Sequence, residues 1–186
     1  MLKAGKDPRE VLKEISDIFP FHASVSAEVV GDSVEEMLEM ADDYIEIGPN
    51  ITIKVPLTPE GLKVCKDLST DDVAVNVTLC FSTAQAILAA KAGATYVSPF
   101  VGRVYDQQFD GIQLIEEISD VYATHKQKTQ ILAASIRDVH QVASCFRVGA
   151  DICTIPSKIF SGMYKHILTD QGIAKFDEDW TKLVGG

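Results

Sequence analysis

Short hydrophobic segments recur along this chain, and between them lie stretches with the hydrophobic spacing of amphipathic helices. The hydrophobic segments are rich in Val, Ile and Ala, a pattern typical of strands that alternate with helices. It predicts strands at residues 23–30, 51–55, 73–78, 96–98, 130–134 and 152–155. It predicts helices at residues 8–18, 33–47, 59–67, 82–92, 111–124 and 139–148, followed by C-terminal helices. Six strands alternating with helices predict an α/β fold with a parallel sheet, either open and doubly wound or closed as a barrel.

Polar and apolar positions alternate within most of these strands, so that one face of each strand is apolar and the other carries functional groups. A parallel sheet covered by helices on both sides would be hydrophobic throughout, whereas a barrel can line its interior with polar side chains. The alternation therefore favours a (β/α) barrel. The polar residues near the carboxyl ends of the strands are Glu28, Lys54, Thr78, Ser98 and Ser135. Barrel enzymes hold their active sites at this end, although each group could instead satisfy a polar neighbour in the interior.

Lys54 has the most distinctive position of these residues. It shares a strand face with Thr52, while Ile53 and Val55 lie on the opposite face. A lysine in a water-poor site can lose its proton and attack carbonyl groups, which is the chemistry of a Schiff-base enzyme. The alternative is a surface lysine on a half-exposed strand.

Composition limits the classes of function. With 186 residues, 46% of them hydrophobic, the chain is predicted to form a single domain over residues 1–186. Its formal net charge of -10 argues against binding nucleic acid or an anionic membrane. No apolar run reaches the length of a membrane span, and the charged start of the chain lacks the apolar core of a signal peptide, so a cytoplasmic protein is predicted.

The sequence contains no metal-binding or nucleotide-binding motif, and no cofactor is predicted. Cys65, Cys80, Cys145 and Cys153 form no C-x-x-C pair and have no histidine at metal spacing, so four reduced thiols are expected.

An apolar stripe runs along the last helical stretch. Ile173, Phe176, Trp180 and Leu183 follow one another at spacings of three and four residues. The stripe is expected to pack either on its own barrel or on a neighbouring subunit, and the spacing does not decide between them.

Longer segments resemble a known family. They are Ile53–Pro56, Thr58–Gly61, Val75–Leu79, Phe81–Ser82, Gly93–Arg103 and Leu132–Arg137. These blocks resemble the transaldolase family, and more narrowly the short transaldolase-like subfamily that also contains fructose-6-phosphate aldolase. The resemblance extends from about Leu2 to the C-terminus.

This resemblance implies a (β/α)8 TIM barrel of the class I aldolase type that transfers a dihydroxyacetone unit from a ketose phosphate to an aldose phosphate, without a cofactor, in the pentose phosphate pathway. It implies that Lys54 forms the Schiff base and that Glu28 and Thr78 hold a catalytic water. Asn76 and Ser98 match positions that contact the bound sugar, and Phe100 lines the same pocket. Arg103, Ser135 and Arg137 match the phosphate site; without the family, the two arginines would be interpreted as surface charges.

Two activities occur in this subfamily, and three residues distinguish them. Glu28 stands where the fructose-6-phosphate aldolases have glutamine, Phe100 where they have tyrosine, and Asn76 where they have an aliphatic residue. All three residues are those of a transaldolase, so transaldolase is the main prediction and fructose-6-phosphate aldolase the alternative. Members of the subfamily form ring-based decamers, so the resemblance also favours a homo-oligomer.

The resemblance begins after the family's first two strands. Family members start with a strand carrying a Leu-Asp-Thr-type motif and a second strand reading Gly-Val-Thr-Thr-Asn-Pro-Ser, and neither is found in this sequence. We therefore expect a barrel that lacks its first two strands. Either the true product starts upstream and this sequence is an incomplete reading of it, or the chain is a truncated relative of the family. The family's acid/base aspartate lies on the first of these strands, and no residue here takes that role. A third hypothesis is accordingly a non-catalytic fragment or structural subunit.

Overall fold

Six parallel strands form one curved sheet in the order β1-β2-β3-β4-β5-β6. The computed structural model describes residues 7–19 and 23–185; the segment 1–6, where the resemblance begins, lies outside the described residues. The strands are β1 (Val25–Glu28), β2 (Ile51–Pro56), β3 (Val75–Cys80), β4 (Tyr96–Pro99), β5 (Gln130–Ala133) and β6 (Ile152–Cys153). All six strands predicted from the hydrophobic pattern are present, although β1 and β6 are shorter than predicted.

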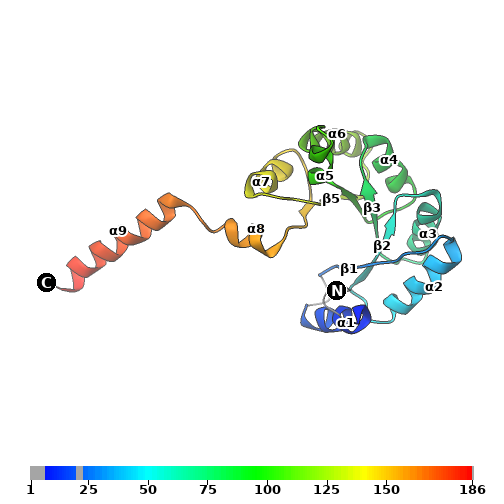
Figure 1. Ribbon diagram of the computed structural model, residues 1–186, viewed down its shortest axis with the longest axis horizontal. Helices are drawn as coiled ribbons and strands as arrows, with labels where there is room; N and C mark the ends of the chain where they lie inside the picture. The colour runs from blue at the N-terminus through cyan, green and yellow to red at the C-terminus, as the bar shows by residue number, and fades with distance from the viewer. Residues whose placement is uncertain (1–6, 20–22, 186) are drawn as a thin grey trace.

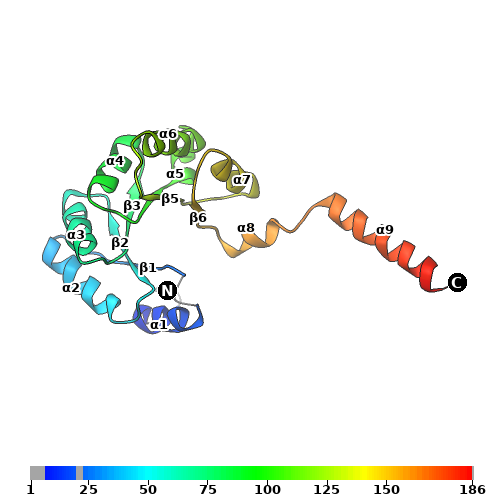
Figure 2. The ribbon, with the colours of Figure 1, turned by 180° about the vertical axis from the view of Figure 1, so that it is seen from behind.

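Most helices between the strands cover the convex side of the sheet, whereas the last two lead away from it (Figure 1). The helices of the described residues are α1 (Pro8–Ile18), α2 (Val34–Ile45), α3 (Pro59–Thr70), α4 (Thr83–Lys91), α5 (Val101–Asp106), α6 (Gly111–Thr124), α7 (Val139–Arg147), α8 (Ser157–Gly162) and α9 (Ile167–Val184). Consecutive parallel strands joined through outer helices curl into part of a barrel, as Figure 2 shows from behind. In the described residues this is an α/β TIM-barrel-like fold with six strands, which confirms the expected fold class.

The apolar faces of the strands form the core between the sheet and the helices. Ile53, Val55, Val75, Val77 and Val97 are all completely buried. Burying an aliphatic side chain of this size contributes about 1.5–3 kcal/mol, so this layer fixes which face of each strand points outward. The alternate residues must then face the inside of the curve.

Most helices begin at a side chain that caps their first turn. The capping residues are Asp7, Ser33, Thr58, Ser82, Asp110, Asp138 and His166, and each accepts a hydrogen bond from a backbone N–H of its helix. Each cap contributes about 1 kcal/mol and sets where the chain turns from loop into helix. The bounds of α1 and α6 agree with the prediction for this reason.

The sequence pattern did not predict α5. This helix has only six residues, and Phe100 precedes it with no capping hydrogen bond from its side chain. Its second residue is Gly102, which disfavours helix. The helix forms because tertiary contacts hold it, since Val101 N–H donates to Ala134 O at 3.0 Å and Phe100 bridges to Ala134.

The C-terminal helix α9 extends away from the curved sheet (Figures 1 and 2). The predicted stripe is exposed, with Phe176 and Leu183 more than 70% accessible. In the isolated chain the stripe therefore does not pack on its own barrel. Among the described residues, no helix combines the length and the apolar character that crossing a membrane would require.

All four cysteines are free thiols, as expected. Burial raises the pKa of the Cys65 thiol and of the Cys80 thiol to about 12. Because the thiolate is the reactive form, these two side chains act as apolar core groups at neutral pH.

Candidate active site

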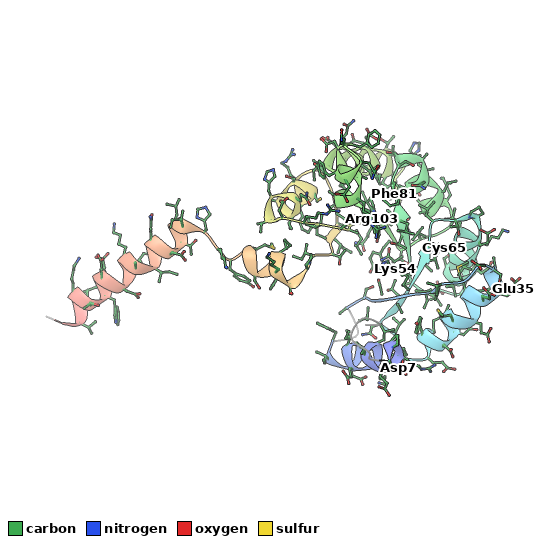
Figure 3. All side chains as sticks on the ribbon, in the orientation of Figure 1. Asp7, Glu35, Lys54, Cys65, Phe81 and Arg103 are labelled. Carbon is green, nitrogen blue, oxygen red and sulfur yellow. The ribbon has the colours of Figure 1, made fainter. Side chains whose placement is uncertain are left out.

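Lys54 and Glu28 form an ion pair on the inner face of the sheet. The register of β1 and β2 places the two residues side by side, and Lys54 Nζ donates to Glu28 Oε2 at 2.9 Å. The Lys54 side chain is 24% accessible, so it lies partly sheltered at the mouth of the curve, where Figure 3 labels it. Its amine is thus within reach of a carboxylate that can exchange protons with it.

Asn76 links three strands beside this pair. It lies opposite Lys54 in the register of β2 and β3. Its Oδ1 accepts a hydrogen bond from Ser98 Oγ at 2.7 Å, and its Nδ2 donates to Ser26 Oγ at 3.4 Å. These bonds fix the orientation of a buried amide next to the amine. Ser26 is a site residue that the sequence alone does not identify, because β1 and β3 are not neighbours in the sheet and only its curvature brings Ser26 to Asn76.

Thr78 is the next inward-facing residue on β3, and its register partner is Pro56. The Thr78 side chain is completely buried, and within the described part of the chain nothing forms a hydrogen bond with its Oγ1. An unsatisfied buried hydroxyl costs about 1–3 kcal/mol. Such a cost is typical of a group reserved for a ligand or a reacting water.

A second group of polar side chains lies where β4 and β5 end. Asp106, the last residue of α5, accepts hydrogen bonds from both Nη1 and Nη2 of Arg137 through its two carboxylate oxygens. The hydrogen bond from Arg137, followed by the charges of Arg137 and Arg103, keeps the pKa of Asp106 below its ordinary value. Arg103 also lies over the Phe100 ring, with its guanidinium carbon 4.7 Å from the ring centroid.

Aromatic rings border this second group. Phe81 lies 5.7 Å from Phe100 between ring centroids, at an interplanar angle of 59°. Together with Phe109 and the two arginines, Phe81 lines a surface hollow, and Figure 3 labels Phe81 and Arg103. Asp106 also lines the hollow, so its walls combine two guanidinium groups, one carboxylate and apolar side chains. The two guanidinium groups beside apolar walls suit a phosphorylated organic molecule.

The backbone around Ser135 is unusually constrained. Ser135 has φ of 60°, in the left-handed region that non-glycine residues seldom adopt. A Cβ at residue 102 would overlap the Ser135 carbonyl oxygen and would lie 2.7 Å from Arg137 Nε and 3.0 Å from Ser135 Oγ. Glycine at residue 102 therefore allows α5 to approach the loop that carries Ser135 and Arg137.

The two groups are adjacent because β4 contributes to both. Ser98 belongs to the hydrogen-bond network beside Lys54, and Phe100, two residues later, begins the segment that carries Arg103. The structure thus brings Glu28, Lys54, Asn76, Thr78 and Ser98 together on the inner face, and Phe100, Arg103, Ser135 and Arg137 at the strand ends. Among the residues described, no three His, Cys, Asp or Glu side chains gather as a metal site would require.

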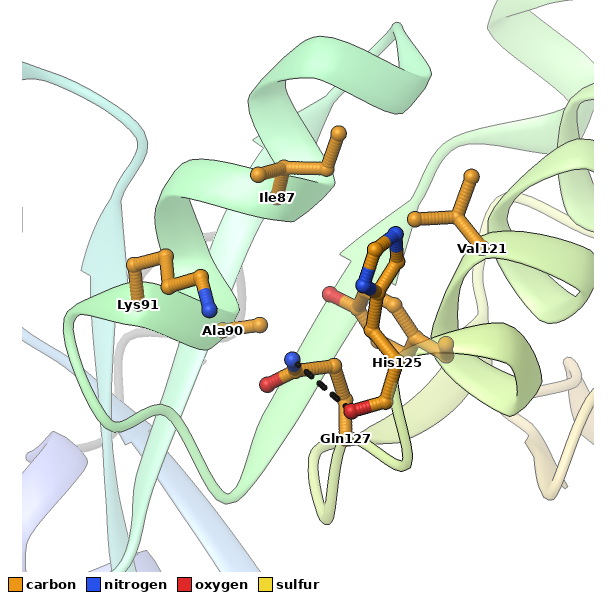
Figure 4. Close-up of a pocket in the computed structure, with 7 residues that line it drawn as sticks. Ile87, Ala90, Lys91, Val121, His125 and Gln127 are labelled. Carbon is orange, nitrogen blue, oxygen red and sulfur yellow. Dashed lines mark hydrogen bonds between the residues drawn. The ribbon is translucent and has the colours of Figure 1, made fainter.

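A separate cavity of about 190 Å³ lies between α4 and α6 (Figure 4). Its walls are mostly apolar, with Lys91, His125 and Gln127 among its lining residues. These residues come from the ends of α4 and α6 and the turn after α6, at the opposite end of the fold from the carboxyl ends of the strands. The cavity therefore does not contribute to the candidate site.

Comparison with known proteins places the chain among close relatives. The family described as Transaldolase/Fructose-6-phosphate aldolase matches residues 8–186. A "Probable transaldolase" of Paracoccus denitrificans is 51% identical over 182 residues, which are 98% of this chain and 83% of that protein. Proteins with the same name from Cereibacter sphaeroides (50% over 182 residues) and Novosphingobium aromaticivorans (51% over 180 residues) cover 98% and 97% of this chain and 82% of their own lengths. The similarity spans both groups of side chains.

Proposed function

The chain belongs to the transaldolase/fructose-6-phosphate aldolase family, and on this basis we propose that it is a transaldolase that uses Lys54 as a Schiff-base nucleophile. The observation that carries the proposal is the Lys54–Glu28 pair on the inner face, at the carboxyl ends of the strands. The proposed reaction moves a dihydroxyacetone unit from sedoheptulose 7-phosphate to glyceraldehyde 3-phosphate, giving erythrose 4-phosphate and fructose 6-phosphate, as part of the pentose phosphate pathway.

In the proposed mechanism, Lys54 transfers a proton to Glu28 and its neutral amine attacks the C2 carbonyl of the ketose. The carbinolamine then loses water as an iminium ion forms, and this step needs a proton delivered to the departing hydroxyl. A water held between Glu28 and the Thr78 hydroxyl, which has no hydrogen-bond partner among the described residues, can relay that proton. As the C3–C4 bond breaks, the C4 hydroxyl gives its proton to water and its oxygen becomes the carbonyl of the departing aldose. The electron pair of the broken bond passes to the iminium, which leaves an enamine on Lys54. In the family an aspartate takes the C4 hydroxyl proton, and we assign that role to none of the residues that the structure describes.

The two groups of side chains divide the substrate between them. Asn76 and Ser98 are proposed to bind the hydroxyl groups of the dihydroxyacetone unit, because their hydrogen bonds hold them beside Lys54. Arg103, Ser135 and Arg137 are proposed to bind the phosphate at the far end of the sugar, with two guanidinium groups suited to a dianion. Binding the phosphate away from the reacting carbons orients the chain of the sugar across the strand ends.

The direct test is acceptor dependence. Purified protein given fructose 6-phosphate alone is expected to release no more than one equivalent of glyceraldehyde 3-phosphate per active site, and to release it continuously when erythrose 4-phosphate is added. The physical reason is that an enamine without a nearby proton donor waits for an aldehyde. Product is measured with a coupled dehydrogenase assay. Release without an acceptor at a comparable rate would show a fructose-6-phosphate aldolase instead.

Phe100→Tyr is expected to shift the enzyme toward that aldolase activity. A tyrosine hydroxyl at residue 100 can supply the proton that releases dihydroxyacetone from the enamine, so acceptor-independent cleavage should rise by about tenfold or more. Phe81→Tyr, which adds the same hydroxyl to the neighbouring ring, serves as the matched control. If both variants or neither variant gained cleavage, the protonation role assigned to residue 100 would be wrong.

We also propose that the protein is a cytoplasmic homo-oligomer. The exposed apolar stripe of α9, together with its extension away from the sheet, supports packing of this helix on a second copy of the chain. Light scattering of the purified protein determines the number of subunits.

A further inference from the structure

Arg137 is fixed at both ends. Its backbone N–H donates to Gln141 Oε1 at 2.9 Å, next to the start of α7. At the other end of the side chain, Nη1 and Nη2 donate to the two carboxylate oxygens of Asp106, which lies 31 residues earlier in the sequence. A two-point contact of this kind fixes the plane of the guanidinium as well as its position.

Asp106 occupies only the terminal edge of that guanidinium. Arginine has five N–H donors, and the carboxylate uses two of them. In the part of the chain that the structure describes, the other three make no further hydrogen bond. The Arg137 Nε and the Ser135 hydroxyl both lie beside Gly102, at 2.7 Å and 3.0 Å from the point where a Cβ of residue 102 would be. Among the described residues, the arrangement therefore leaves Arg137 donors unused on the side where Gly102 and Ser135 lie.

Stability does not explain this ion pair. The Arg137 and Asp106 side chains are 50% and 45% accessible, and exposed ion pairs contribute little to folding. A carboxylate beside a phosphate site also repels a dianion. A carboxylate at this place must therefore contribute something that outweighs the repulsion. The contribution that the geometry offers is the fixed orientation of the Arg137 guanidinium.

We propose that Asp106 is a positioning residue for phosphate recognition, which holds Arg137 by its terminal edge so that the Nε edge and Ser135 together receive the phosphate of the sugar. The proposal rests on the proposed function, because it takes Arg137 as a phosphate ligand. Arg103 completes the group, and with Asp106 ionised the three charged side chains carry a net charge of +1.

The test uses Asp106→Asn, which keeps the size of the side chain and removes its charge. The KM for fructose 6-phosphate is expected to rise about tenfold, with kcat within about threefold of the wild type. Borohydride trapping of dihydroxyacetone, which has no phosphate, should reach half-saturation at the same concentration as in the wild type. Inorganic phosphate, titrated calorimetrically in the absence of turnover, should bind about tenfold more weakly.

Asp43→Asn is the control, because it removes another exposed ion pair, with Arg9 at 3.3 Å, between α1 and α2. It is expected to leave all three measurements unchanged. Unchanged or tighter phosphate binding by Asp106→Asn would overturn the proposal, and so would an equal loss with dihydroxyacetone, which would indicate a general structural role. If the wild type binds phosphate but transfers no dihydroxyacetone unit, the proposed function fails, and the calorimetric comparison still decides the role of Asp106.

Discussion

Lys54→Met is expected to abolish both dihydroxyacetone transfer and borohydride trapping. Methionine has a similar length and shape but no amine, so no Schiff base can form, and the transfer rate should fall by at least about 10⁴-fold. Trapping is measured by treating the protein with fructose 6-phosphate and borohydride and then analysing its peptides by mass spectrometry. Transfer is measured with the acceptor-dependent assay. The adduct should be found on the peptide that contains residue 54 of the wild type and nowhere in the variant.

Lys63→Met is the matched control for this substitution. Lys63 is an exposed lysine on α3, and its replacement should change neither trapping nor turnover. The Lys54 variant should also remain folded, because the partner it leaves, Glu28, is 48% accessible and can be hydrated. A folded wild-type protein that yields no adduct would favour the third hypothesis, a non-catalytic fragment or structural subunit. An adduct on another lysine would contradict the role assigned to Lys54.

The strands and the inner face could be predicted from sequence because burial repeats with a period of two. Ile53 and Val55 have to face the helices, so Lys54 has to face inward, and the same rule places Asn76 and Thr78. Partners across strands could not be predicted in this way. The register that brings Glu28 within 2.9 Å of Lys54 depends on the whole sheet and leaves no local signal in the sequence.

The region around α5 shows the other limit of sequence reasoning. Its six residues lack a cap, and tertiary hydrogen bonds to the end of β5 hold it in place, so local propensity did not predict it. Asp106 was missed with it, because an acidic residue beside two arginines is apparent only after the helix is positioned. Arg103 and Arg137 were identified through the family resemblance, since nothing in their own sequence context distinguishes them from surface charges.

Gly102→Ala is expected to damage phosphate recognition more than any change at the protein surface. The added Cβ would overlap the carbonyl oxygen of Ser135, a backbone atom that cannot rotate away, and would press on Arg137 Nε. Either α5 or the Ser135 loop must shift, and each carries proposed phosphate ligands. A displacement of about 1 Å in such a site lowers kcat/KM by about 100-fold, and overpacking of this kind costs about 1–3 kcal/mol of stability. Steady-state kinetics with fructose 6-phosphate measures the fall in kcat/KM, and urea denaturation measures the loss of unfolding free energy.

Gly172→Ala makes the same chemical change where nothing lies within 4 Å of the new Cβ. In the middle of α9 it should stabilise the helix by about 0.5–1 kcal/mol and leave kcat/KM unchanged. The contrast separates close backbone approach from the general effect of replacing glycine. If Gly102→Ala retained wild-type kinetics with fructose 6-phosphate, the phosphate could not depend on the close approach of α5 to Ser135, and its site would have to be sought elsewhere. If Gly102→Ala instead lost activity only with phosphorylated substrates and kept dihydroxyacetone trapping on Lys54, phosphate recognition would be located at this contact and the chemistry at the neighbouring strands.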